Sequence, residues 1–108
     1  IVHKICELYK FSHECLKTFP KQDRLSLGRK IEETILDILE LALSASFKNK
    51  IIKINLLFKL SDKIDLTKVL IRLAFETKCT SIEKYLTLQE KVVELGKITG
   101  GWIKDTQK

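Results

Sequence analysis

The residues best suited to chemistry are few: two histidines and three cysteines. His3, Cys6 and His13 lie within about 80° of one another on a helical projection, so one face of a helix would carry all three. Histidine and cysteine are common zinc ligands, and such a trio could hold the ion. The alternative is a half-buried cysteine with two surface histidines, and we favour this structural interpretation.

Other catalytic arrangements are missing or weak. The sequence has no glycine-rich phosphate loop and no Glu-x-x-His pair of the kind that binds iron in helical bundles. The acidic pairs Glu32–Glu33 and Glu90–Glu94 lie beside lysines on amphipathic segments, which is typical of a solvated surface rather than of acid–base catalysis. We therefore expect no enzymatic activity, no cofactor and no resident metal.

The cysteines also bear on the compartment. Cys6, Cys15 and Cys79 are odd in number, widely spaced and without a C-x-x-C pair, so a disulfide framework is not expected. This pattern favours a reducing cytoplasm. No apolar run approaches the roughly 18 residues that a membrane span needs, so we expect a cytoplasmic protein without membrane contact.

Composition restricts the fold class. A chain of 108 residues with 44% hydrophobic and 31% charged residues is typical of one soluble domain with a core of its own. Four glycines and one proline are too few for a turn-rich all-β fold. Aromatic residues make up 7%, which disfavours a base-stacking platform for single-stranded nucleic acid.

Positive charge is concentrated in two segments of a chain whose net charge is +6. Residues 48–63 carry five lysines against one aspartate, and a second cluster follows Pro20. Clustered cations suit the phosphate backbone of nucleic acid, which they bind in a salt-dependent and largely sequence-independent way. A solvated, lysine-rich surface is the equal alternative. The candidate residues are Lys48, Lys50, Lys53, Lys59 and Lys63, and then Lys21, Arg24, Arg29 and Lys30.

Apolar periodicity predicts four helices, at about residues 1–17, 24–47, 50–78 and 81–105. Pro20 ends the first, because the residue before a proline is disfavoured in the α region. Asp23 or Ser26 is the candidate cap of the second helix, Asn49 of the third, and Thr80 or Ser81 of the fourth.

The spacing of apolar residues indicates how these helices pack. The last helix repeats its apolar positions as a heptad, at Tyr85, Leu88, Val92, Leu95, Thr99 and Trp102. The third has two apolar faces, which suggests a central position or a contact with a neighbouring subunit. Four helices with short connections predict an all-α, antiparallel up-down four-helix bundle with the two basic clusters at opposite ends.

Glycines near the carboxyl end are unusual. Gly96, Gly100 and Gly101 each cost about 1 kcal/mol relative to alanine inside a helix. We expect a close helix–helix approach across Gly96 and Gly100, with Trp102 filling the adjacent gap. The alternative is that Gly100–Gly101 ends the helix.

Four segments together resemble one known family. They are Phe19-Pro20-Lys21-x-x-Arg24, Leu27-Gly28-x-x-Ile31, the leucine-rich helix ending at Ala45, and Leu95-Gly96-x-x-x-Gly100-Gly101-Trp102-Ile103-Lys104. The family is that of Avd, the accessory variability determinant of diversity-generating retroelements, with the proteins of 23S rRNA intervening sequences as relatives. The resemblance covers about residues 4–105, and its last segment is more similar to Avd.

The resemblance implies a non-enzymatic protein. Avd-type proteins form a homopentameric barrel with a basic surface, and they associate with a reverse transcriptase and with RNA or DNA in mutagenic cDNA synthesis. Intervening-sequence relatives share the fold and have no settled role. Three classes therefore stay open: a nucleic-acid and reverse-transcriptase accessory protein, a protein-interaction scaffold, and a metal-binding or catalytic bundle using His3, Cys6 and His13.

Overall fold

The computed structural model describes residues 1–108, which form helices and short connections without any strand. The helical segments are α1 (Val2–Leu16), α2 (Lys21–Asp23), the π-helical turn η1 (Arg24–Gly28), α3 (Arg29–Ser46), α4 (Lys50–Glu76) and α5 (Ile82–Gln107). Because α2, η1 and α3 follow one another without a break, the chain makes four rods. The predicted all-α four-helix bundle is confirmed.

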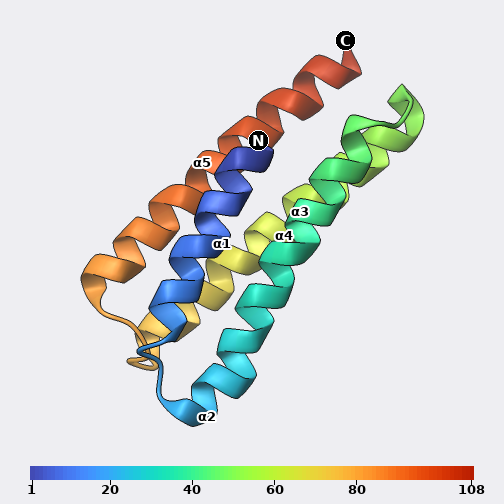
Figure 1. Ribbon diagram of the computed structural model, residues 1–108. Helices are drawn as coiled ribbons and strands as arrows, with labels where there is room; N and C mark the ends of the chain where they lie inside the picture. The colour runs from blue at the N-terminus through green and yellow to red at the C-terminus, as the bar shows by residue number, and fades with distance from the viewer.

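The four rods run up and down in chain order (Figure 1). Helix α1 packs on α3 and α5, and α4 packs on the same two helices from the other side. The bundle is elongated, with extents of 45 × 21 × 20 Å, and α1 is its shortest rod. The turn between α3 and α4 and the end of α5 project beyond the N-terminus, so α1 does not reach this end (Figure 1).

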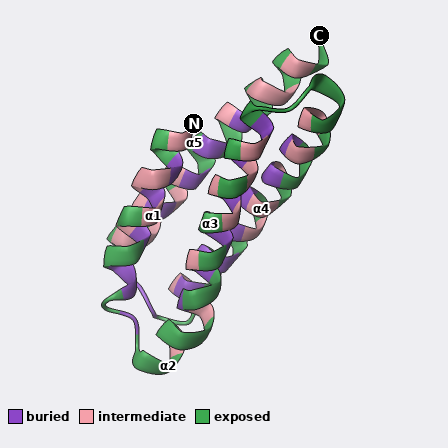
Figure 2. Cartoon of the chain, turned by 45° about the vertical axis from the view of Figure 1, so that its right-hand side comes forward, coloured by how far each residue is buried: buried purple, intermediate pink, exposed green.

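The core follows the apolar stripes of the helices, as the burial pattern in Figure 2 shows. The heptad positions Leu88, Val92, Leu95 and Thr99 of α5 are at most 3% exposed. Each fully buried leucine or isoleucine contributes about 1.5–3 kcal/mol through removal of apolar surface from water. The second face of α4 differs, because Val69 and Leu73 are each 41% exposed.

Two of the predicted helix caps are confirmed. The Oδ1 of Asn49 accepts a hydrogen bond from the backbone N–H of Ile52 at 3.1 Å, and the Ser81 Oγ accepts one from Lys84 N at 3.2 Å. These side chains satisfy N–H groups that the first turn of a helix leaves free. At the other end of α4, Lys78 takes a positive φ of 65°, which turns the chain toward α5.

The start of the second rod differs from the prediction. Helix begins directly after Pro20, and neither Asp23 nor Ser26 caps it. Instead the backbone widens into the π-helical turn η1, where Gly28 is buried. A Cβ at Gly28 would lie 3.2 Å from the Leu16 side chain and 3.4 Å from the Asp23 carbonyl oxygen. The glycine therefore allows this turn to pack closely against the end of α1.

The glycines of α5 behave differently from Gly28. Helix α5 continues to Gln107, so Gly100–Gly101 does not end it. The expected close approach is absent within the chain: a Cβ at Gly96 would meet only the Ile64 side chain, at 3.9 Å, and one at Gly100 would meet nothing within 4 Å. Trp102 is partly buried against the core. Packing of these glycines against a second subunit stays a prediction.

No helix is both long enough and apolar enough to cross a membrane.

Candidate nucleic-acid interface

The two basic clusters lie at opposite ends of the bundle. Helix α2 forms one end, and the turn between α3 and α4 forms the other (Figure 1). We call the first the α2 end, defined by Lys21, Arg24, Arg29 and Lys30. We call the second the hairpin tip, defined by residues 47–53, with the sequence Phe-Lys-Asn-Lys-Ile-Ile-Lys.

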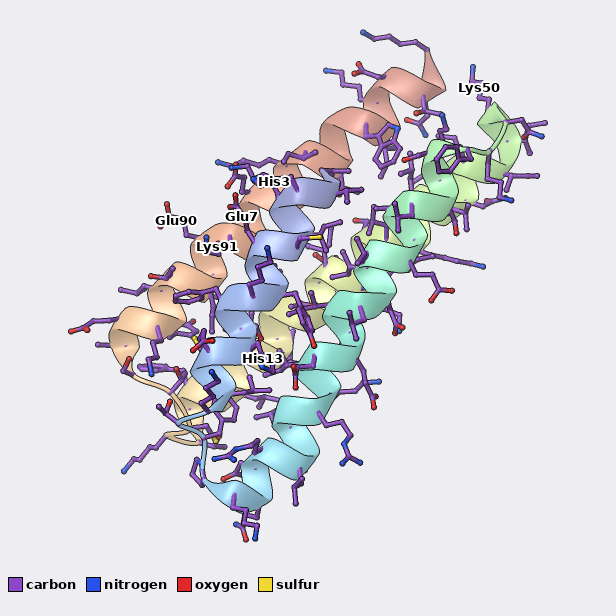
Figure 3. All side chains as sticks on the ribbon, viewed as in Figure 1. His3, Glu7, His13, Lys50, Glu90 and Lys91 are labelled. Atoms are coloured by element: carbon purple, nitrogen blue, oxygen red, sulfur yellow. The ribbon has the colours of Figure 1, made fainter.

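Three of the five lysines predicted between residues 48 and 63 belong to the hairpin tip. Lys48 and Lys50 are exposed and Lys53 is half-buried. Lys50 projects from the end of the hairpin (Figure 3), where its Nζ donates a hydrogen bond to the backbone oxygen of Lys108 at 2.9 Å. Residues 41–61 contain no aspartate or glutamate, so nothing within this segment neutralises the tip lysines.

Lys59 and Lys63 lie apart from the tip, in a groove of about 530 Å³ between α3 and α4. The Lys63 Nζ is 3.3 Å from Asp37 Oδ2. Glu40 and Asp62 line the same groove, so three carboxylates face two lysines there. This balance offers little attraction for a polyanion. The tertiary structure thus divides the five-lysine cluster into a basic tip and a mixed-charge groove.

The α2 end is also divided. Lys21, Arg29 and Lys30 are exposed, with no ion pair among those that the structure forms. One guanidinium nitrogen of Arg24 instead donates to the backbone oxygens of Lys17 and Phe19, at 3.1 and 3.3 Å. Arg24 therefore holds the connection between α1 and α2, and three cations remain for a ligand.

The sequence analysis missed the apolar side chains of the hairpin tip. Phe47 is 85% exposed and Ile51 is 79% exposed, the two highest values among the large hydrophobic residues. The spacing of apolar residues could not show that these two side chains lie outside the core, since a short apolar run has the same pattern in a buried and in an exposed segment. The neighbouring lysines were the available signal, because Phe47 directly precedes Lys48 and Ile51 lies between Lys50 and Lys53, and lysine is mostly exposed.

The geometry argues against one metal ion bound by His3, Cys6 and His13. Ten residues of helix separate the two histidines by about 15 Å along the axis. His3 Nε2 lies 2.6 Å from Glu7 Oε1, and His13 Nδ1 lies 3.1 Å from Glu32 Oε2 (Figure 3). No group of three or more histidine, cysteine, aspartate or glutamate side chains is placed to hold a metal.

One carboxylate of each acidic pair, Glu32 and Glu94, serves as a structural partner. A hydrogen bond to the Glu32 carboxylate, its negative charge and burial raise the pKa of Tyr9, whose ring also stacks on His13. Glu94 Oε1 pairs with Lys4 Nζ at 3.3 Å, which links α5 to α1. Among the thiols, burial raises the pKa of Cys15, so this group is held in its less reactive protonated form.

A further surface is apolar. On the outer side of α4 and α5, Val69 and Val93 line one groove, and helical spacing continues the stripe along each helix. Its exposed members are Val69, Leu73, Ile82, Leu86 and Val93, each between 39% and 58% exposed. We call these five residues the α4–α5 face. Several large apolar side chains grouped in this way indicate a contact with protein.

Comparison with known proteins agrees with the resemblance seen in the sequence. A family model described as bAvd-like matches residues 1–106, which is nearly the whole bundle. No curated protein sequence matches the chain significantly. Because the family match runs from α1 through α5 of the four-helix bundle, the chain belongs to the bAvd-like family.

Proposed function

We propose that this chain is a cytoplasmic, non-enzymatic accessory protein that binds the backbone of RNA or DNA and a retroelement reverse transcriptase. In this role it supports mutagenic cDNA synthesis. The observation that carries the nucleic-acid part is the hairpin tip, where Lys48, Lys50 and Lys53 lie in a segment without any acidic residue. The reverse transcriptase part rests on membership of the bAvd-like family.

Three features support this proposal. Lysine ammonium groups attract phosphate without reading bases, as a protein that acts on varied sequences requires. The α2 end offers a second, smaller group of cations in Lys21, Arg29 and Lys30. Three free cysteines fit the reducing conditions of the cytoplasm.

The proposal includes assembly into a homopentamer through the α4–α5 face, together with the exposed glycines Gly96 and Gly100. A closed ring would present the hairpin tip once per subunit, so weak individual contacts would add through effective concentration. Interfaces of obligate assemblies commonly bury about 2,000 Å² or more. Light scattering coupled to size exclusion tests this point, and a monomer at micromolar concentration would contradict it.

The binding test replaces Lys48, Lys50 and Lys53 with glutamine and measures affinity for an RNA oligonucleotide across a salt series. If the three side chains contact phosphates, affinity falls and the log–log salt slope decreases by about 2–3, at 0.7–0.9 per contact. The matched control replaces Lys10, Lys91 and Lys97, which removes the same charge from α1 and α5. If the tip variant and the parent bind with equal affinity at every salt concentration, the tip is not the interface, and the α2 end becomes the candidate.

The partner test uses the reverse transcriptase encoded nearest to the gene. We expect the two proteins to co-purify after co-expression, and the cDNA product to require the accessory chain. A reverse transcriptase that makes the same product alone would contradict this part of the proposal while leaving nucleic-acid binding intact.

A second function, a protein-interaction scaffold of the intervening-sequence type, is favoured by the groove between α3 and α4. Leu41, Leu56 and Leu66 line it among charged side chains, a composition that suits a protein segment better than a polyanion. Binding through this groove would be insensitive to moderate salt, whereas phosphate binding at the tip would not be.

A further inference from the structure

Phe47 is the aromatic residue that the fold uses least. Of the eight aromatic side chains, only Phe47 and Phe58 are exposed, at 85% and 46%. The others are at least partly covered, and two of them, Phe75 and Tyr85, stack with ring centroids 4.5 Å apart. Because so little of the Phe47 ring is buried, this side chain contributes little to stability, and its ring is free for a ligand.

The backbone holds Phe47 in a defined position. Its N–H bonds to the Ser44 oxygen at 3.2 Å, and the N–H of Lys48 bonds to the Ala45 oxygen at 3.4 Å. Two residues later, Asn49 caps α4 through Ile52. The turn is thus fixed from both sides, and residues 46–52 are all exposed, as the colour of the turn shows (Figure 2).

A shallow, open hollow of about 310 Å³ lies beside the Phe47 ring. Leu43, Ser44, Phe47 and Lys48 line it. Leu43, which is 43% exposed, adds an apolar wall, and the Ser44 hydroxyl can donate or accept a hydrogen bond. The Lys48 ammonium supplies positive charge at the rim. An aromatic face, a hydroxyl and a cation together match the parts of one nucleotide: base, polar edge and phosphate.

We propose that this hollow is a subsite for an unpaired nucleotide, whose base stacks on Phe47 while Lys48 contacts its phosphate. The inference rests on the proposed function, and it narrows the ligand to single-stranded RNA or DNA. Bases inside a duplex are stacked on one another and cannot reach the ring. Stacking tolerates any base, so the subsite gives strand selectivity without sequence selectivity. Lys50 lies two residues further on, outside the hollow, where its Nζ donates to the backbone oxygen of Lys108.

The test compares Phe47→Leu with the parent on a single-stranded 20-mer of uridine and on a 20-base-pair RNA duplex. Leucine keeps apolar volume and removes the ring. We expect single-strand affinity to fall about 5- to 150-fold, which corresponds to about 1–3 kcal/mol for one stacked base. Duplex affinity and the salt slope should not change, and Phe47→Trp should restore single-strand binding. Phe58→Leu, the matched control on α4, should bind both ligands like the parent.

The outcomes separate this inference from the proposed function. Unchanged single-strand binding by Phe47→Leu, with weak binding by the tip lysine variant, would overturn the subsite and leave phosphate binding in place. Equal losses on both ligands would also overturn it, because they indicate a general disturbance of the tip. A third arm uses vesicles of phosphatidylserine and phosphatidylcholine. Phe47-dependent vesicle binding that the uridine 20-mer does not compete away would assign the tip to an anionic membrane surface instead.

Discussion

The hairpin tip and the α2 end carry the same net charge and use it differently. Residues 47–53 contain three lysines and no acidic residue, and residues 21–30 contain four basic residues against Asp23, so each segment has a net charge of +3. At the α2 end, the Arg24 guanidinium donates to the backbone oxygens of Lys17 and Phe19. At the tip, Lys50 donates to the backbone oxygen of Lys108, whereas the side chains of Lys48 and Lys53 form no ion pair or hydrogen bond and lie near the exposed Phe47 and Ile51.

The comparison distinguishes cations that hold the fold together from cations that are free to bind a ligand. A cation that already donates to a carbonyl or a carboxylate must give up that contact to bind a ligand, so it adds less affinity than an unpaired one. The α2 end combines one such committed charge, Arg24, with a buried glycine and a π-helical turn. Apart from the cap Asn49, the exposed side chains of the tip stand outside the core, and changes to them should alter binding rather than stability. Four predictions test this contrast, in order of decreasing effect on the free energy of unfolding.

Gly28→Leu should have the largest effect. Its side chain would enter space that Leu16 occupies, since even a Cβ would lie 3.2 Å from that residue. Overpacking of this kind costs about 1–3 kcal/mol, and thermal denaturation followed by circular dichroism should report it. Gly100→Leu is the control, because nothing lies within 4 Å of a Cβ there. In the single bundle it should stabilise α5 by about 0.5–1 kcal/mol, through helix propensity. If Gly100→Leu folds normally but forms a smaller assembly than the parent, Gly100 lies at a contact between subunits.

Arg24→Gln should destabilise the protein by about 1 kcal/mol, because two hydrogen bonds from its guanidinium to Lys17 and Phe19 would be lost. For a domain of this size that loss lowers the melting temperature by about 4–8 °C. Arg29→Gln removes the same charge from an exposed position and should change stability by less than about 0.5 kcal/mol. Equal melting temperatures for the two variants would mean that Arg24 is as free as its neighbours.

Asn49→Ala should cost about 1 kcal/mol, since the first turn of α4 would lose its capping acceptor for Ile52. Asn55→Ala, in the exposed interior of the same helix, is the matched control and should be slightly stabilising. Urea denaturation of both variants measures the difference. If Asn49→Ala has no effect, the tip is not held as rigidly as the nucleotide subsite requires.

Phe47→Ser and Ile51→Ser should have the smallest effect, within about 0.5 kcal/mol of the parent. Both residues are at least 79% exposed, so folding buries little of their apolar surface, and their replacement loses little stabilisation. Chemical denaturation tests this directly. A decrease of 2 kcal/mol or more in the free energy of unfolding, if it depends on protein concentration, would instead indicate that these residues are buried in a contact between subunits.

Much of the fold was predictable because its signals are local. Pro20, Asn49 and Ser81 mark breaks or helix starts through the geometry of a few neighbouring residues, and the heptad of α5 identifies its buried face. The π-helical turn was not predictable in this way. It lies against Leu16 through Gly28, and these two residues come together only when α1 and the second rod pack.

The candidate site shows the same division. The sequence by itself determined the four helices, the core stripes and the concentration of positive charge, since each depends on residue type and spacing along one helix. Only the tertiary structure decided that Lys63 would pair with Asp37, that Arg24 would hold a turn, and that Phe47 would stay outside the core. These outcomes depend on how far each helix is rotated and shifted against its neighbour. Small rotations decide which side chains meet, and the packing of the whole core sets them.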